Sequence, residues 1–135
     1  MIYEATITYV AIDEKGNDKV HKEMYLIDDK NLFAEVEHAL YEELANVVTN
    51  LDVTAIKRSR IKEIANYPQT NDEKIFLATL VDVFLNDDGS EKEMKYTIAF
   101  FAKDITAAHA FITQYITQGY NMNVVAIKET NFALL

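Results

Sequence analysis

The pentad VTAIK at residues 53–57 returns almost unchanged as VVAIK at residues 124–128, 71 positions later in a chain of 135 residues. A second pair of segments repeats at nearly the same spacing. Ala5 in the segment EATIT matches Ala78 in LATLV, 73 positions apart. Similar segments at a nearly constant spacing indicate an internal repeat. Such a repeat constrains the whole architecture, so it takes precedence over any single motif.

Two further landmarks extend the match. Gly16 in DEKGND and Gly89 in NDDGSE are 73 positions apart, and the apolar stripes of two predicted helices align at 72 positions, from Phe33 to Ile105. The spacing between matching positions falls from 73 to 71, and two single-residue deletions in loops account for this difference. We infer two copies of one unit, residues 1–64 and 75–135, joined by a connector over 65–74.

Each copy is predicted to run strand, turn, strand, helix, strand. The first strand alternates apolar and polar residues, as a strand exposed on one face does, whereas its counterpart at 75–85 is apolar on both faces. The glycines in the two turns favour tight hairpins. Apolar residues spaced three and four apart then predict one helix per copy. Expected helix ends are Asn31 and Asp104 as N-caps and Gly119 after the second helix.

Connection rules give the topology of each copy. A hairpin sets the second strand antiparallel to the first, and the helix returns the third strand beside the first, which predicts the order 2-1-3. One helix on a three-stranded sheet is too small a unit to fold independently. We therefore expect the two copies to join through their sheets about a pseudo-twofold axis. The predicted fold class is α+β: a single domain of two tandem β-β-α-β repeats in one largely antiparallel sheet system with two helices.

Composition limits the class of protein. Half of the residues are apolar and 26% are charged, as expected for one folded domain of this length. The absence of cysteine excludes disulfides and thiol chemistry, and fits a reducing compartment. With no signal peptide or apolar run of membrane length, we expect a cytoplasmic, soluble protein of a bacterium or an infected host cell. The net charge of −9 disfavours coating of duplex DNA through the overall field.

Several short segments carry a resemblance to a known family: a charged hairpin after the first strand, MYLID before the helix, VTAIKRS, and the last strand VVAIKET. With these features the chain resembles a family of small proteins of unknown function from gut-associated bacteria and their phages. The resemblance covers most of the chain and implies no reaction. For phage members it suggests a role in replication or host takeover.

No arrangement of residues predicts catalysis. The three histidines, His21, His38 and His109, fall in different elements without metal-binding spacing, so neither a metal nor any other cofactor is expected. The segment NDDGS lacks the later ligands of a calcium loop and is explained by a hairpin turn. The three glycines form no phosphate-binding loop, and adjacent acidic pairs are typical of solvated surfaces. We therefore expect a protein that is not an enzyme.

One segment is unusually basic for an acidic protein. IKRSRIK at residues 56–62 holds both arginines of the chain, and its counterpart in the second copy keeps a single cation, Lys128. In a continuous strand, Arg58, Arg60 and Lys62 would project from one face and form a cationic row able to contact successive phosphates, while Lys57 would point to the opposite face. The opposing interpretation is a cationic edge strand that guards against aggregation. The cations of this candidate site are Lys57, Arg58, Arg60, Lys62 and Lys128.

Tyrosines supply surfaces on which bases can stack, and those expected near a sheet face or the connector are Tyr25, Tyr67 and Tyr96. The first hypothesis is therefore a non-enzymatic single-stranded nucleic-acid-binding accessory protein, with phage replication as the process suggested by the family resemblance. The alternative is a protein-interaction or homo-oligomeric module, as a homodimer or with a host protein. It is suggested by the doubly apolar strand at 75–85, which needs more cover than two helices provide. An enzyme with a site gathered from separate elements is a third possibility, and no membrane partner is expected.

Overall fold

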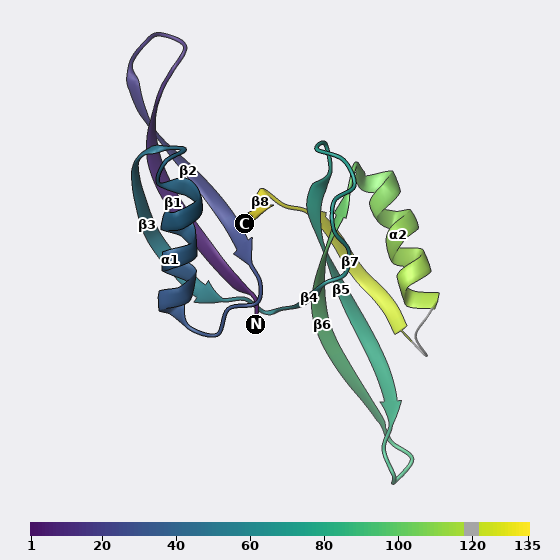
Figure 1. The fold of residues 1–135 in the computed structure, drawn as a ribbon. Coiled ribbons are helices and arrows are strands. Elements are labelled where there is room, and N and C mark those ends of the chain that lie inside the picture. Colours follow the sequence, from purple (N-terminus) through teal and green to yellow (C-terminus); the bar gives the residue numbers. More distant parts are fainter. Residues whose placement is uncertain (118–121) are drawn as a thin grey trace. The chain divides into compact units, whose positions relative to one another are not determined.

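Two long β-hairpins, each followed by a helix and a returning strand, dominate the protein (Figure 1). A computed structural model describes residues 1–117 and 122–135, so the helix end expected at Gly119 lies outside the described residues. In the described part of the chain the elements are β1 (Tyr3–Ile12), β2 (Asp18–Ile27), α1 (Phe33–Leu44), β3 (Thr49–Arg58), β4 (Ile61–Ile64), β5 (Lys74–Leu85), β6 (Glu91–Ala102), α2 (Ile105–Thr117), β7 (Met122–Glu129) and β8 (Phe132–Leu134).

The chain divides into two compact units, and each takes residues from both halves of the sequence. Unit 1 comprises Met1–Ser59 and Asn131–Leu135, and unit 2 comprises Arg60–Thr130. Unit 1 holds a four-stranded sheet in the order β3-β1-β2-β8, and unit 2 holds one in the order β4-β6-β5-β7. In each sheet three strands are antiparallel neighbours, and the short strand, β8 or β4, adds in parallel at the edge.

The α+β class is confirmed, and so is the predicted order of the strands on either side of the first strand in each unit, β3-β1-β2 and β7-β5-β6. Two expectations about the sheets are wrong. The described residues form eight strands rather than six, and these strands make two mixed sheets instead of one largely antiparallel system. The cause is that the residues after β3 and β7 continue as β4 and β8 and add in parallel. Strands of three or four residues are too short for alternation to reveal them.

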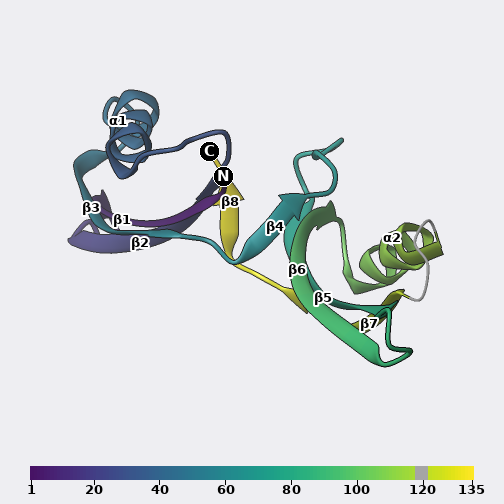
Figure 2. The same ribbon diagram turned by 90° about the horizontal axis from the view of Figure 1, so that it is seen from below.

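In unit 1 the core lies between α1 and one face of the sheet (Figure 2). Side chains of a strand alternate between its two faces, so Tyr3, Ala5 and Ile7 of β1 all point to the helix side. They are at most 1% exposed and pack with Val36 and Leu40 of α1, which are fully buried. The predicted apolar stripe of this helix is therefore the face that packs on the sheet.

Unit 2 repeats this arrangement with larger side chains. Phe76 and Leu80 of β5 and Phe100 of β6 are buried beneath α2, together with Ile112. The Phe100 ring stacks on that of Phe76, with 5.9 Å between centroids, and on that of Phe111, at 4.9 Å. Aromatic pairs at these separations add to the stabilisation that burial alone provides.

Most of the turns and helix caps predicted from the sequence are confirmed. Gly16 and Gly89 have φ angles of +80° and +85°, the left-handed conformation that glycine adopts readily. Asp104 caps α2, because its Oδ1 accepts a hydrogen bond of 2.8 Å from the backbone N–H of Ala107. The N-cap expected at Asn31 is wrong: α1 begins after Leu32, which has extended backbone and makes no side-chain cap bond.

Candidate functional site

The basic segment does not form one continuous strand. β3 ends at Arg58 and β4 begins at Ile61, and the boundary between the two units falls between Ser59 and Arg60. The expectation that Arg58, Arg60 and Lys62 form a row on one uninterrupted strand is therefore wrong. Its residues are shared between two units, and their role in binding stays a prediction.

Lys57 and Lys128 occupy corresponding places in the two sheets. Lys57 lies opposite Glu4 in the β1–β3 pairing, and Lys128 lies opposite Leu77 in the β5–β7 pairing. Both lysines are exposed, and each lies on the sheet face opposite the helix, because its neighbour alternates with the core residues of β1 or β5. The Nζ of Lys57 is 4.0 Å from Glu4 Oε1, so part of its charge is compensated.

The other cations differ in their surroundings. Arg58 and Arg60 are exposed, and in the described residues of its own unit neither arginine has a carboxylate within ion-pair distance. The Nζ of Lys62 lies 4.3 Å from the centroid of the Tyr96 ring, a cation–π contact within unit 2. Among the described residues of its own unit, each guanidinium is thus without a carboxylate partner, whereas the Lys62 ammonium lies over the Tyr96 ring.

The three candidate tyrosines are not equivalent as stacking surfaces. Tyr25 packs against the core of unit 1, and Tyr96 packs against the core of unit 2. Tyr67 follows β4 and is 66% exposed. A base needs an accessible ring face on which to stack, so the structure favours Tyr67 over Tyr25 and Tyr96 for this role.

A group of polar side chains on the helix side of the unit 1 sheet escaped the sequence analysis. Glu23 accepts hydrogen bonds from the hydroxyl groups of Tyr9, at 2.7 Å, and Tyr25, at 2.6 Å. The His21 ring stacks on Tyr9, with 5.4 Å between centroids, and its Nε2 is buried without a hydrogen-bond partner in the described residues. The strand register alone signals this cluster, because the pairs Ala5–Tyr25, Ile7–Glu23 and Tyr9–His21 place these side chains on one face.

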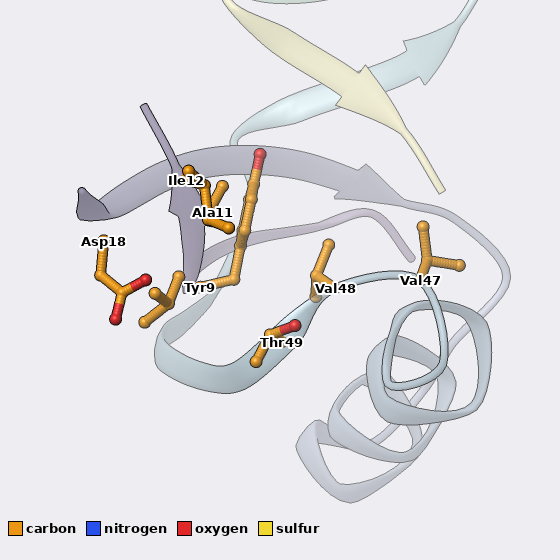
Figure 3. Close-up of a pocket in the computed structure, with 8 residues that line it drawn as sticks. Tyr9, Ala11, Ile12, Asp18, Val47, Val48 and Thr49 are labelled. Atoms are coloured by element: carbon orange, nitrogen blue, oxygen red, sulfur yellow. The ribbon is translucent and has the colours of Figure 1, made fainter. Parts of the chain in front are cut away.

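A cavity of about 370 Å³ adjoins this cluster at the end of β1 (Figure 3). Tyr9, Ala11 and Ile12 of β1 line it, together with Val47, Val48 and Thr49 from the segment that leads into β3. The lining is mixed, because Tyr9, Asp18 and Thr49 carry polar groups and the other lining side chains are apolar. The cavity has the size of a small-ligand pocket, but it brings together none of the residues predicted from the sequence.

The hydrogen bonds to Glu23 affect the titration of both phenols. The pKa of Tyr25 is raised, first by burial and then by its hydrogen bond to Glu23. The pKa of Tyr9 is raised mainly by its own hydrogen bond to the same carboxylate. A neutral phenol can donate this bond and a phenolate cannot, so the folded state keeps both protons to higher pH than the unfolded state does.

We therefore expect unit 1 to lose stability in alkaline solution. Below pH of about 10, the ordinary pKa of tyrosine, both states keep the proton and the contribution is complete; above it the unfolded state ionises first, and stability falls as pH rises. Urea unfolding followed by circular dichroism between pH 8 and 11 measures this loss. Tyr9→Phe combined with Tyr25→Phe should flatten the dependence, and an unchanged slope in this variant would contradict the assignment.

The tips of the hairpins expose apolar side chains. We call residues 10–20 the unit 1 arm and residues 82–95 the unit 2 arm; they include the distal ends of β1 and β2 and of β5 and β6 (Figure 1). The exposed fractions are 71% for Ile12 and 67% for Val20 in the unit 1 arm. In the unit 2 arm they are 44% for Phe84, 77% for Leu85 and 51% for Met94. Contiguous exposed apolar side chains mark candidate interaction surfaces.

The described residues contain neither a cluster of metal ligands nor a membrane-spanning helix. In residues 1–117 and 122–135, no group of three or more His, Asp or Glu side chains is placed to hold a metal ion. Over the same residues, no helix has both the length and the apolar character needed to span a membrane.

Comparison with known proteins gives a family without a recorded activity. None of the curated proteins matches the chain. A family described as "Domain of unknown function (DUF4494)" matches residues 1–133, nearly the whole sequence. Because this single family profile extends across both units of the fold, the chain belongs to the DUF4494 family of proteins.

Proposed function

We propose that the protein is a non-enzymatic protein-interaction module whose unit 2 arm docks on a partner surface that is apolar at its centre and cationic around it. The observation that carries this proposal is the exposure of Phe84, Leu85 and Met94 at the tip of the β5–β6 hairpin. Interfaces commonly use a few apolar anchors surrounded by a polar rim. The arm offers both parts on one projecting element.

The position of the arm explains why these side chains are uncovered. Phe76 and Leu80 share the helix-side face of β5 with Phe84, since side chains on one face recur every second residue. The first two are buried in the core beneath α2, whereas Phe84 is 44% exposed. Leu85 points to the opposite face and is more exposed still, so the arm tip presents apolar side chains on both faces.

The negative charge of the unit 2 arm determines which kind of partner surface it favours. A carboxylate-rich arm favours a cationic rim on the partner, and such complementarity mainly speeds and orients association. It also makes binding sensitive to salt, because exposed charges are screened. Residues 82–95 hold five carboxylates, Asp82, Asp87, Asp88, Glu91 and Glu93, and two lysines, Lys92 and Lys95.

We also propose that the two units arose by duplication of one β-β-α-β unit. In support, Ala5 pairs with Tyr25 and Ile56, and Ala78 pairs with Ile98 and Ile127, so the strand registers correspond at offsets of 73 and 71. If one ancestral unit gave both arms, the acidic and doubly apolar tip is a difference acquired by one copy. The pseudo-twofold relation expected from the sequence stays a prediction.

A synthetic peptide of alternating lysine and leucine residues is a suitable probe of the unit 2 arm. We expect isothermal titration calorimetry at low salt to show binding to the full chain, and Phe84→Ser combined with Leu85→Ser to weaken it about tenfold, equivalent to about 1.4 kcal/mol. The loss follows from removing the two apolar anchors while leaving the charge unchanged. Raising the salt concentration should weaken binding to the wild-type chain.

The unit 1 arm provides the matched control. Ile12→Ser combined with Val20→Ser removes two exposed apolar side chains from the corresponding hairpin, and we expect it to leave the peptide affinity unchanged. Equal affinities for all three proteins would show that the peptide responds only to the net charge of −9, and would exclude the arm as the docking element.

Single-stranded nucleic-acid binding is a second candidate function, favoured by one observation. Arg58 and Arg60 are exposed, and within the described part of its unit neither guanidinium is paired with a carboxylate. Together with Lys57, Lys62 and the exposed Lys128, they remain the proposed phosphate contacts; Tyr67 is the proposed stacking residue, with Tyr25 and Tyr96 less accessible. A link to phage replication stays a prediction.

A salt titration with a labelled single-stranded oligonucleotide tests this second function. With about four phosphate contacts, the slope of log K against log salt should be near −3. Arg58→Glu combined with Arg60→Glu should abolish the binding, whereas Phe84→Ser with Leu85→Ser should not affect it. Absence of binding at low salt would rule this function out without bearing on the arm.

A further inference from the structure

Each sheet is completed by a short strand from the other half of the sequence. β4 follows β3 along the chain, yet it pairs with β6 of unit 2, and β8 follows β7, yet it pairs with β2 of unit 1. The registers correspond: Ile61 lies opposite Thr97, and Phe132 lies opposite Met24. The edge of β2 is thus a binding site for an extended segment, and β8 fills it.

The way β8 docks defines the ligand that this edge accepts. Phe132, Ala133 and Leu134 lie opposite Met24, Tyr25 and Leu26 in a parallel pairing. The backbone N–H of Leu135 then donates a hydrogen bond of 3.1 Å to Leu26 O, and its side chain packs against the unit 1 core. The site therefore takes a short apolar segment in extended conformation, held by backbone hydrogen bonds and a final apolar side chain.

The residues after β4 add hydrogen bonds to the unit 2 sheet. After β4, Ala65 N–H donates to Ala99 O at 2.8 Å, which corresponds to the bond that Leu135 makes. Asn66 adds two further bonds, since its Oδ1 accepts from Phe101 N–H at 2.6 Å and its Nδ2 donates to Phe101 O at 3.1 Å. β8 is the shorter strand, with three residues against four in β4, so it is the strand expected to detach.

We propose that the β2 edge also accepts β8 from a second copy of this chain, which gives a strand-exchanged dimer. The exchanged strand makes the same contacts as the chain's own strand, so the dimer requires no new surface. Exchange of an identical element between protomers is a recognised low-cost route to dimers. The occupant is specified by the structure itself, because β8 already lies on this edge in the single chain.

The concentration at which exchange appears follows from competition between the two strands. A segment joined by a short connection has an effective concentration of the order of millimolar. Chains at about 10 μM should then exchange in roughly one case in a hundred, and chains near 1 mM in tens of per cent. The dimer is thus expected in concentrated solution rather than in dilute solution.

Site-directed crosslinking of the full chain tests the proposal, because the sequence contains no cysteine. Met24→Cys and Phe132→Cys in one molecule should give an intramolecular disulfide, since these residues lie opposite each other. Each substitution alone, in an equal mixture equilibrated at about 1 mM and then oxidised briefly, should give a disulfide between chains. A non-reducing gel measures both products, and Tyr25→Cys with Ala133→Cys serves as a second pair if the first disturbs folding.

A matched control measures random collisions. Lys19→Cys lies on β2 near the hairpin tip, five residues from Met24 or roughly 16 Å along the strand. Its mixture with Phe132→Cys should crosslink several-fold less than the test mixture. An excess of the wild-type chain should reduce the test product, because its β8 competes for the same edge.

Two results would overturn the proposal. One is a yield between chains that stays at the control level at about 1 mM, although the two cysteines in one molecule do link. The other is failure to link within one molecule for both pairs, which would remove β8 from the β2 edge altogether. Phe84→Ser with Leu85→Ser should leave the exchange unchanged, so the outcome is independent of the unit 2 arm.

Discussion

Replacing Phe100 by alanine is expected to lower the free energy of unfolding of unit 2 by about 3 to 5 kcal/mol. Phe100 is fully buried, and its ring lies between those of Phe76 and Phe111, so truncation removes both stacking contacts and leaves a cavity. The change is a large share of the total stability of a small domain. Urea unfolding monitored by circular dichroism measures it.

Phe84→Ala is the matched control for Phe100→Ala. It removes the same atoms from a side chain that is 44% exposed, on the strand next to β6. We expect it to cost much less, because solvent already reaches the ring and no closed cavity forms. Equal losses for the two variants would show that Phe100 is not at the centre of the unit 2 core.

Leu40→Ala is expected to destabilise unit 1 by about 2 to 5 kcal/mol. Leu40 is fully buried on the inner face of α1, where it packs with Val36, Tyr3 and Ile7. Hydrogen exchange measured by mass spectrometry separates the two units, since peptides from β1 and β2 report on unit 1 and peptides from β5 and β6 report on unit 2. The loss of protection should be largest in the unit 1 peptides.

Tyr41→Ala is the control on the same helix, because Tyr41 is next to Leu40 in sequence but 39% exposed. It should have a smaller effect on protection than Leu40→Ala. A larger effect from Tyr41 would mean that α1 packs through a different face from the one described above.

The parts of the fold that sequence reasoning predicted are those with long periodic patterns. The ten-residue alternation of β1 and the three-and-four spacing of α1 each repeat several times, so the signal exceeds chance. β4 and β8 have four and three residues, and no periodicity can establish itself over that length. The partners of these strands come from the other half of the sequence, which no local pattern records.

The candidate site was predicted less well, for a related reason. The cationic row required residues 57–62 to form one strand, and the break after Arg58 depends on pairing with two different sheets. The cluster around Glu23 depends on the register between β1 and β2, which brings Tyr9 and Tyr25 within reach of one carboxylate. In both cases the residue types could be read from the sequence. Which of these side chains lie close together depends on how the strands pair in the folded protein.

The crossed assignment of β4 and β8 has a consequence for biosynthesis. The amino-terminal domain of a multidomain chain generally folds first as it emerges from the ribosome. Here unit 1 cannot complete its sheet until residues 132–134 have been made, and β4 has no partner until β6 has been made. The nascent chain therefore carries an unfinished sheet edge from the synthesis of β2 until that of β8, and a chaperone that covers such edges would protect it during that interval.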